Sequence, residues 1–166
     1  SLVDDRWVGA DNESSNELLV KTHLLVNNAA NATFIGLVGD QADAFDGVAA
    51  AIERVSGLLN NIDVMILGMG EDGHTASIFP CCEQVEPAMA KDNVAGLIAT
   101  VPTTAAYQRI SFTLNQILAA KQVYLPLAGD KKLAVFEQAT VLENNQLMPI
   151  SAVIQQHQSL DVLICR

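Results

Sequence analysis

The chain has 166 residues, of which 50% are hydrophobic and 17% are charged. This length and composition suit one globular domain with a buried core and exclude an intrinsically disordered chain. A net charge of −10 disfavours non-specific binding to nucleic acid, which requires the opposite sign. No apolar run reaches the ~18 residues that a membrane-spanning helix needs.

The first third of the chain predicts the end of a strand, two helices and one further strand. Residues 1–3 resemble the end of a strand that leads into the polar segment 4–6. Ser and Glu three residues apart in segment 14–17 form a capping box and predict the start of a helix. An apolar run predicts a strand at 33–38, and apolar residues at helical spacing predict a helix over 43–60.

The rest of the chain continues this alternation of strands and helices. Nearly continuous runs of Ile, Val, Leu and Met are typical of strands in a parallel sheet that is covered on both faces. Strands are expected at residues 62–67, 96–101, 109–114, 122–127 and 160–165, and helices at 130–139 and 150–156. The pattern predicts a single layered α/β domain over residues 1–166.

A glycine-rich turn after the 62–67 strand carries the clearest chemical signal. His74 is expected near the start of a helix that Pro80 ends after about two turns. The dipole of that helix would disfavour a protonated imidazole, so His74 would act as a general base, with Asp72 orienting it or holding a substrate hydroxyl. Free N–H groups of the turn, Gly70 and Gly73 included, would bind substrate and stabilise an oxyanion.

Other interpretations of this loop stay open on spacing alone. Residues 68–73 match the GxGxxG pattern of dinucleotide sites, but Glu71 and Asp72 would place negative charge where a pyrophosphate lies. Ser77 lacks the strained turn of a nucleophile elbow, so water activated by His74 fits better than an acyl-enzyme. Both His74 and Asp72 also fit the description of ordinary polar turn residues.

Cysteines and histidines are too few and too scattered to indicate a disulfide framework or a metal site. The chain has three of each, without a CxxC pair or a cluster of ligand spacing. We expect no metal and no cofactor. Unpaired thiols are typical of a reducing compartment, so we expect a cytoplasmic protein. No feature of the sequence predicts an oligomeric state.

Four segments, in order along the chain, resemble the 6-phosphogluconolactonase family. They are Asp-Asp-Arg-Trp-Val at 4–8 with Ser15 and Asn16, Gly-Met-Gly-Glu-Asp-Gly-His-Thr-Ala-Ser-Ile-Phe-Pro at 68–80, Pro102 with Arg-Ile-Ser-Phe-Thr at 109–113, and Gly-Asp-Lys-Lys at 129–132. The resemblance implies a three-layer, mostly parallel Rossmann-like sheet with helices on both faces, shared with glucosamine-6-phosphate deaminases.

The same resemblance implies a reaction and roles for individual residues. The reaction is the metal-independent hydrolysis of 6-phosphoglucono-1,5-lactone to 6-phosphogluconate in the pentose phosphate pathway. His74 would be the base and Asp72 its neighbour in the site. Arg109 and Lys132 would bind the substrate phosphate, and Arg6 would lie at the same mouth. A sugar-phosphate lactone would then be the small-molecule partner.

The sequence also departs from the family pattern. Family members are longer, with a leading strand, a helix and a glycine-rich phosphate loop before the segment at 4–8, so we expect this domain to lack that part. Asp5 replaces the usual Glu, and Gly9 the usual Pro. Two alternatives remain: a deaminase/isomerase, which the Ser-Ile-Phe-Pro ending at 77–80 disfavours, and an inactive fragment that only binds a sugar phosphate or pairs through an exposed sheet edge.

Overall fold

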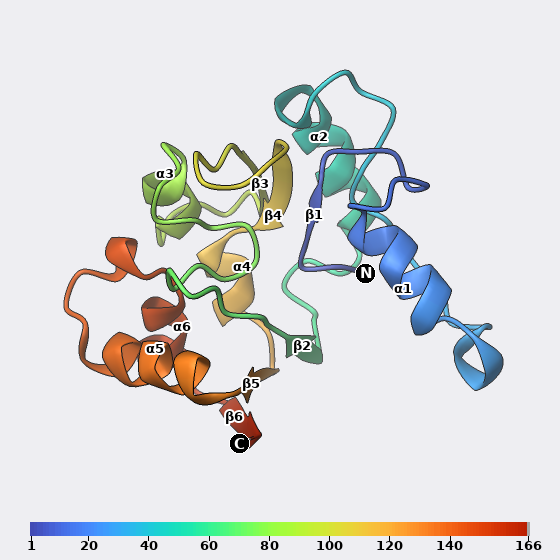
Figure 1. Ribbon diagram of the computed structural model, residues 1–166. Coiled ribbons are helices and arrows are strands. Elements are labelled where there is room, and N and C mark those ends of the chain that lie inside the picture. Colours follow the sequence, from blue (N-terminus) through green and yellow to red (C-terminus); the bar gives the residue numbers. More distant parts are fainter. Residues whose placement is uncertain (166) are drawn as a thin grey trace.

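The computed structural model describes residues 1–165, whose strands form two three-stranded sheets (Figure 1). In the first sheet, β4 (Arg109–Phe112) lies between β1 (Asp4–Arg6) and β3 (Leu97–Thr100), and both pairs are antiparallel. In the second, β5 (Gln122–Ala128) lies between β2 (Val64–Ile66) and β6 (Leu160–Cys165), and both pairs are parallel. Parallel pairing is therefore confined to the second sheet.

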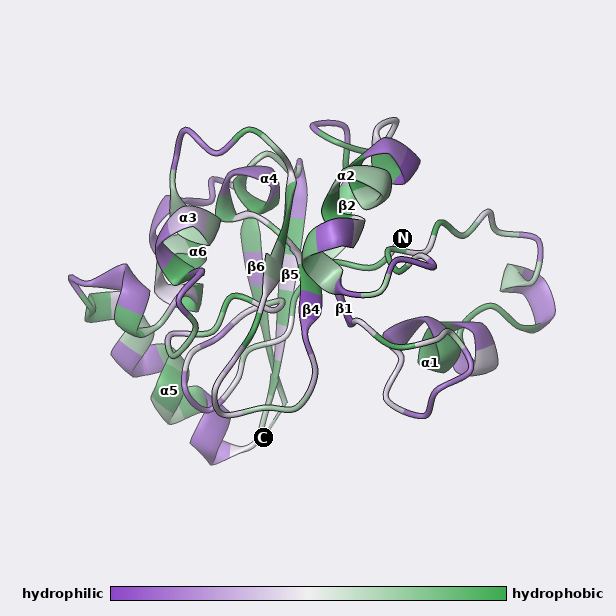
Figure 2. Cartoon of the chain, turned by 90° about the horizontal axis from the view of Figure 1, so that it is seen from above, coloured by the Kyte–Doolittle hydropathy of each residue, from purple (hydrophilic) through white to green (hydrophobic). Residues whose placement is uncertain are grey.

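Helices pack against both sheets, as expected for a layered α/β domain. The helices are α1 (Asn16–His23), α2 (Ala44–Val55), α3 (Val85–Met89), α4 (Leu114–Leu118), α5 (Asp130–Val141) and α6 (Ile150–Gln156), with short 3₁₀ turns at Asn27–Ala29 and Asn145–Leu147. Figure 2 shows α3, α5 and α6 together on one side of β5 and β6. Helix α2 packs instead against β3 and β4. The layered α/β architecture is confirmed, and within residues 1–165 no helix is long and apolar enough to cross a bilayer.

The core is continuous across both sheets, since one buried cluster includes Ile110 of β4 and Val55 of α2 as well as residues of the parallel sheet and its helices. Every second residue of β5, from Val123 to Leu127, points into it, as the two-residue period of a strand requires. Ile117 of α4 and Ile150 of α6 are fully buried in the same cluster. This packing fixes the carboxyl end of β2, where the glycine-rich turn begins.

Five of the predicted strands are confirmed, and the one at residues 33–38 is wrong. That segment has no regular secondary structure, with a bend at Leu37, which is fully buried, and the segment pairs with no strand of the described chain. Its backbone is instead tied to α2, because the guanidinium of Arg54 donates a hydrogen bond to the Leu37 carbonyl at 2.6 Å. The strand expected to end at residues 1–3 is displaced by a few residues and becomes β1.

The four helices predicted outside the glycine-rich turn are present as α1, α2, α5 and α6, whereas α3 and α4 were not predicted. Ser15, one residue later than expected, caps α1 by accepting a hydrogen bond from the Leu18 N–H at 3.2 Å. The helix expected to begin near His74 does not form. Gly73 and Ala76 have φ values of 77° and 48°, and this left-handed backbone interrupts any right-handed helix. The helix-dipole argument for a neutral His74 is therefore wrong.

Candidate functional site

His74 and Asp72 form a close pair at the surface of the glycine-rich turn. Nδ1 of His74 lies 2.6 Å from Oδ1 of Asp72, and the same carboxylate oxygen accepts a hydrogen bond from the His74 backbone N–H at 3.1 Å. When the ring is neutral, an Nδ1–H that donates to a carboxylate leaves the lone pair on Nε2. The pair is thus arranged so that Nε2 can take a proton from a bound molecule.

Glycine at position 70 leaves room for this pair. A β-carbon there would overlap the His74 ring and the Asp72 carboxylate. The N–H groups of Gly70 and Gly73 donate within the turn, to the carbonyls of His74 (2.8 Å) and Gly70 (3.1 Å). Because these two N–H groups already have partners, the structure does not favour them as oxyanion donors, although Gly70 lines the pocket.

One pocket gathers residues from four separate parts of the chain around His74. Its volume is about 400 Å³. It is lined by Leu2, Val3, Asp4, Asn16, Ile66, Leu67, Gly68, Met69, Gly70, His74, Ala76 and Lys132. Lys132, near the start of α5, donates to the Met69 carbonyl and so holds its ammonium group beside the turn. The predicted base and one predicted phosphate ligand therefore share a cavity.

The two predicted arginines lie beside this pocket rather than in its wall. The ring of Phe79 stacks on the His74 imidazole, with 3.9 Å between centroids, and the Arg109 guanidinium lies 5.1 Å from the same Phe79 ring. Arg6 donates at 2.5 Å to Oδ1 of Asn16, which does line the pocket. Burial lowers the pKa of Arg109, and the nearby charge of Arg6 lowers it further.

Arg109 also has a hydrogen-bond donor that no other group of the described chain engages. Its side chain is almost entirely buried, and its Nε–H has no hydrogen-bond partner in the described chain. Within residues 1–165, one terminal nitrogen of Arg109 donates a hydrogen bond, to the Ala106 carbonyl at 3.3 Å. Two close guanidinium groups, one of them with an unpaired donor, form a local positive region in an acidic protein.

Asp4 is a pocket residue whose role sequence reasoning did not assign. Its carboxylate accepts a hydrogen bond from the Ser77 hydroxyl at 2.6 Å, which joins β1 to the glycine-rich turn. Burial raises the pKa of Asp4, and this effect outweighs the opposing effects of Ser77 and the two arginines. Two signals in the sequence pointed to Asp4: its position at the expected end of a strand and its place in the family-like segment 4–8.

Within residues 1–165, no three His, Cys, Asp or Glu side chains gather in a way that could hold a metal ion. The side chains in and beside the pocket can perform acid–base chemistry. His74 supplies a base that Asp72 orients, Asp4 supplies a carboxyl that holds its proton more tightly than usual, and Lys132 supplies positive charge.

Known proteins match this chain over nearly its whole length. The model of the family described as glucosamine-6-phosphate isomerases/6-phosphogluconolactonase matches residues 1–163. A 6-phosphogluconolactonase of Pseudomonas putida is 35% identical over 99% of this chain and 67% of its own length. One of Neisseria meningitidis is 37% identical over 97% of this chain and 69% of its own. The chain thus spans about two thirds of the length of these relatives.

Solved structures of the same family are also similar to this chain. The crystal structure of a 6-phosphogluconolactonase from Shewanella baltica matches with a TM-score of 0.93 and 44% identity, over 98% of this chain and 70% of that one. A monomeric glucosamine-6-phosphate deaminase matches with a TM-score of 0.77 and 17% identity, which shows a shared fold alone. The chain belongs to the glucosamine-6-phosphate isomerase/6-phosphogluconolactonase family.

Proposed function

We propose that this protein hydrolyses 6-phosphoglucono-1,5-lactone to 6-phosphogluconate, a step of the pentose phosphate pathway, with His74 as the general base and without a metal. The observation that carries the proposal is that His74, paired with Asp72, lines one pocket together with Lys132. The lactonase names of relatives at 35% to 44% identity support the reaction. A phosphorylated sugar lactone and unpaired thiols fit a cytoplasmic enzyme.

Positive charge beside the pocket supports a phosphorylated substrate. Lys132 donates to a neutral carbonyl and forms no ion pair within residues 1–165, so its charge is available to an anion. Arg109 has an unpaired Nε–H next to the ring that stacks on His74. In a chain of net charge −10, a phosphate dianion needs such a local cluster of cations. We assign Lys132 and Arg109 to the phosphate and Arg6 to the side of the same region.

The proposed reaction follows from the orientation of the imidazole. Asp72 holds the Nδ1–H, and Nε2 of His74 takes a proton from water as the water oxygen attacks C1 of the lactone. The carbonyl oxygen becomes an oxyanion. When it re-forms the carbonyl, the bond from C1 to the ring oxygen breaks, and His74 returns its proton to that oxygen. Asp4, with its raised pKa, is placed to hydrogen-bond a substrate oxygen.

The direct test is a lactonase assay of the purified chain and of its His74→Ala variant. We expect the substitution to lower kcat by roughly 10²- to 10⁴-fold, the usual contribution of a general base. The control is His157→Ala, because His157 bonds the Ala120 carbonyl far from the pocket. An inactive parent chain, or equal turnover by parent and His74→Ala, would contradict the proposal. Release of ammonia from glucosamine 6-phosphate would favour the deaminase alternative instead.

A further inference from the structure

The hydrogen bond to Asp72 fixes one atom of the His74 imidazole but not the plane of the ring. Nδ1 lies 2.6 Å from Oδ1 of Asp72, and in the described chain this is the one hydrogen bond of the ring. Both side chains are partly exposed, so the surrounding atoms do not enclose them. A general base must be held close to the proton that it takes, because small errors in geometry lower the rate. The imidazole therefore needs a second contact.

Phe79 provides that contact. Its ring stacks on the imidazole of His74, with 3.9 Å between the centroids and 21° between the planes. The Nδ1–H bond lies in the plane of the imidazole and the stacked ring lies above it, so Asp72 and Phe79 restrain different motions. Phe79 does not line the catalytic pocket, so its ring would act on a substrate through His74 rather than by touching it.

The segment that leads to Phe79 is held by the antiparallel sheet. The N–H of Ser77 donates to the Ser111 hydroxyl at 3.1 Å, and the Ser77 carbonyl accepts from the Thr100 hydroxyl at 2.9 Å. The carbonyl of Phe79 in turn accepts from the N–H of Cys82 at 3.2 Å. Phe79 is 4% exposed but lies outside the apolar cluster of the core. Core packing alone therefore does not explain an aromatic ring at this position.

Phe79 also lies beside the group that we assign to the substrate phosphate. The guanidinium carbon of Arg109 is 5.1 Å from the centroid of the Phe79 ring. Arg109 has an anchor of its own in the hydrogen bond to the Ala106 carbonyl at 3.3 Å. The closer contact of Phe79 is with the imidazole, so the base is the group that its ring is placed to orient.

We propose that Phe79 is a positioning residue for the lactonase reaction. The face of its ring fixes the plane of the His74 imidazole, and Asp72 fixes the rotation within that plane, so that Nε2 points at the attacking water. The inference rests on the proposed function, because it takes His74 as the base. It predicts that loss of the aromatic face slows proton transfer and leaves substrate binding unchanged.

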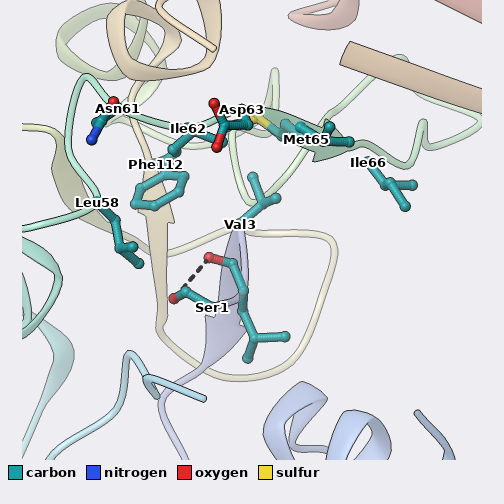
Figure 3. Close-up of a pocket in the computed structure, with 11 residues that line it drawn as sticks. Ser1, Val3, Leu58, Asn61, Ile62, Asp63, Met65, Ile66 and Phe112 are labelled. Atoms are coloured by element: carbon teal, nitrogen blue, oxygen red, sulfur yellow. Dashed lines mark hydrogen bonds between the residues drawn. The ribbon is translucent and has the colours of Figure 1, made fainter. Parts of the chain in front are cut away.

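The first test is the kinetics of Phe79→Leu, which keeps an apolar side chain and removes the flat face. We expect kcat to fall by about 10- to 100-fold while KM changes little, because the phosphate contacts remain. Phe112→Leu is the matched control, since Phe112 is 2% exposed and does not line the catalytic pocket. Figure 3 shows Phe112 in the wall of a second cavity, of about 520 Å³, together with Leu58 and Ile62.

The second test measures the stack without relying on catalysis. The ring current of Phe79 should shift the imidazole protons of His74 upfield in the NMR spectrum of the parent chain. Phe79→Leu should move these signals downfield, and Phe112→Leu should leave them in place. The signals are identified by their loss in His74→Ala and are compared at the alkaline plateau of a pH titration. Phe79→Met, whose side chain adapts to irregular spaces, replaces Phe79→Leu if that variant does not fold.

Three results would overturn the inference. A folded Phe79→Leu with the kcat of the parent would show that the stack is not needed. A change confined to KM would show that Phe79 supports Arg109 and the phosphate rather than the base. Unchanged imidazole signals in Phe79→Leu would show that the two rings are not stacked. An inactive parent chain would contradict the proposed function, and the NMR comparison would still decide whether Phe79 orders the ring of His74.

Discussion

Gly70 lies so close to His74 that a β-carbon at position 70 would overlap Nδ1 of the imidazole. Gly70→Ala should therefore push the ring away from Asp72 and lower kcat about 100-fold or more, because a small displacement of a catalytic group is costly. A lactonase assay measures the change in kcat, and a melting curve shows whether the variant is folded. Gly57→Ala is the control, since nothing lies within 4 Å of a β-carbon at Gly57. An unchanged kcat in Gly70→Ala would show that catalysis does not need the His74–Asp72 pair.

Asp72→Asn tests whether the carboxylate orients the imidazole. An amide can donate to Nδ1, which would favour the tautomer with its proton on Nε2 and remove the base from the pocket side. We expect kcat to fall by roughly 10²- to 10⁴-fold while KM changes little, because the phosphate contacts remain. Asp63→Asn is a suitable control, since Asp63 forms an exposed ion pair with Lys121. A change confined to KM would instead place Asp72 in substrate binding.

The sequence predicts those parts of the fold and site that depend on local pattern. The bounds of α6 and β6 are predicted to the residue, because an apolar run between turn residues specifies each of them. The segment at 33–38 is also largely apolar. Whether such a segment forms a strand depends on a neighbouring strand to pair with, and its own residues do not specify that neighbour. The left-handed backbone at Ala76 is equally invisible, since alanine is a good helix former.

The contacts of the site also fall into two groups, those that follow from local sequence and those that depend on tertiary packing. His74 and Asp72 are two residues apart in one turn, so their contact follows from the local chain. Asp4 and Ser77 are 73 residues apart and meet only because β1 pairs with β4 beside the turn. The placement of Arg109 against Phe79, next to rather than inside the pocket, also depends on tertiary packing that no motif records.

Asp4→Asn should raise stability near neutral pH while it lowers activity. Burial raises the pKa of Asp4 above its ordinary value of 3.8, so the folded chain holds this proton more tightly than the unfolded chain. The stability of the parent therefore falls as the pH rises from about 3.8 through the raised pKa, and is constant above it. Asparagine does not ionise and can still accept from Ser77, so the variant lacks this loss.

Melting temperatures between about pH 3 and pH 8 measure the effect. The advantage of Asp4→Asn over the parent should be largest at the upper end of this range and should shrink as the pH falls towards 3.8. Asp11→Asn, a change at an exposed loop position, is the control. A difference in melting temperature that stays constant with pH would show that Asp4 does not titrate as the structure implies.

Cys81 should be alkylated more readily than Cys82 at neutral pH. Partial burial is the largest single effect and raises its pKa, but hydrogen bonds from Thr103 and Thr104 outweigh it and lower the pKa to about 7. The Thr104 hydroxyl lies 3.2 Å from the sulfur. Because the thiolate is the reactive form, the rate of iodoacetamide labelling at Cys81 should reach half its maximum near pH 7.

Peptide mass spectrometry separates this labelling from that of Cys82, whose pKa burial raises. Thr104→Val removes one of the hydrogen bonds that stabilise the thiolate, so it should move the midpoint at Cys81 upward, towards the ordinary value of 9.0. Thr140→Val, on the exposed side of α5, should leave the midpoint unchanged. If both variants behave like the parent, the two threonines do not control the thiol, and its reactivity must come from the rest of the loop.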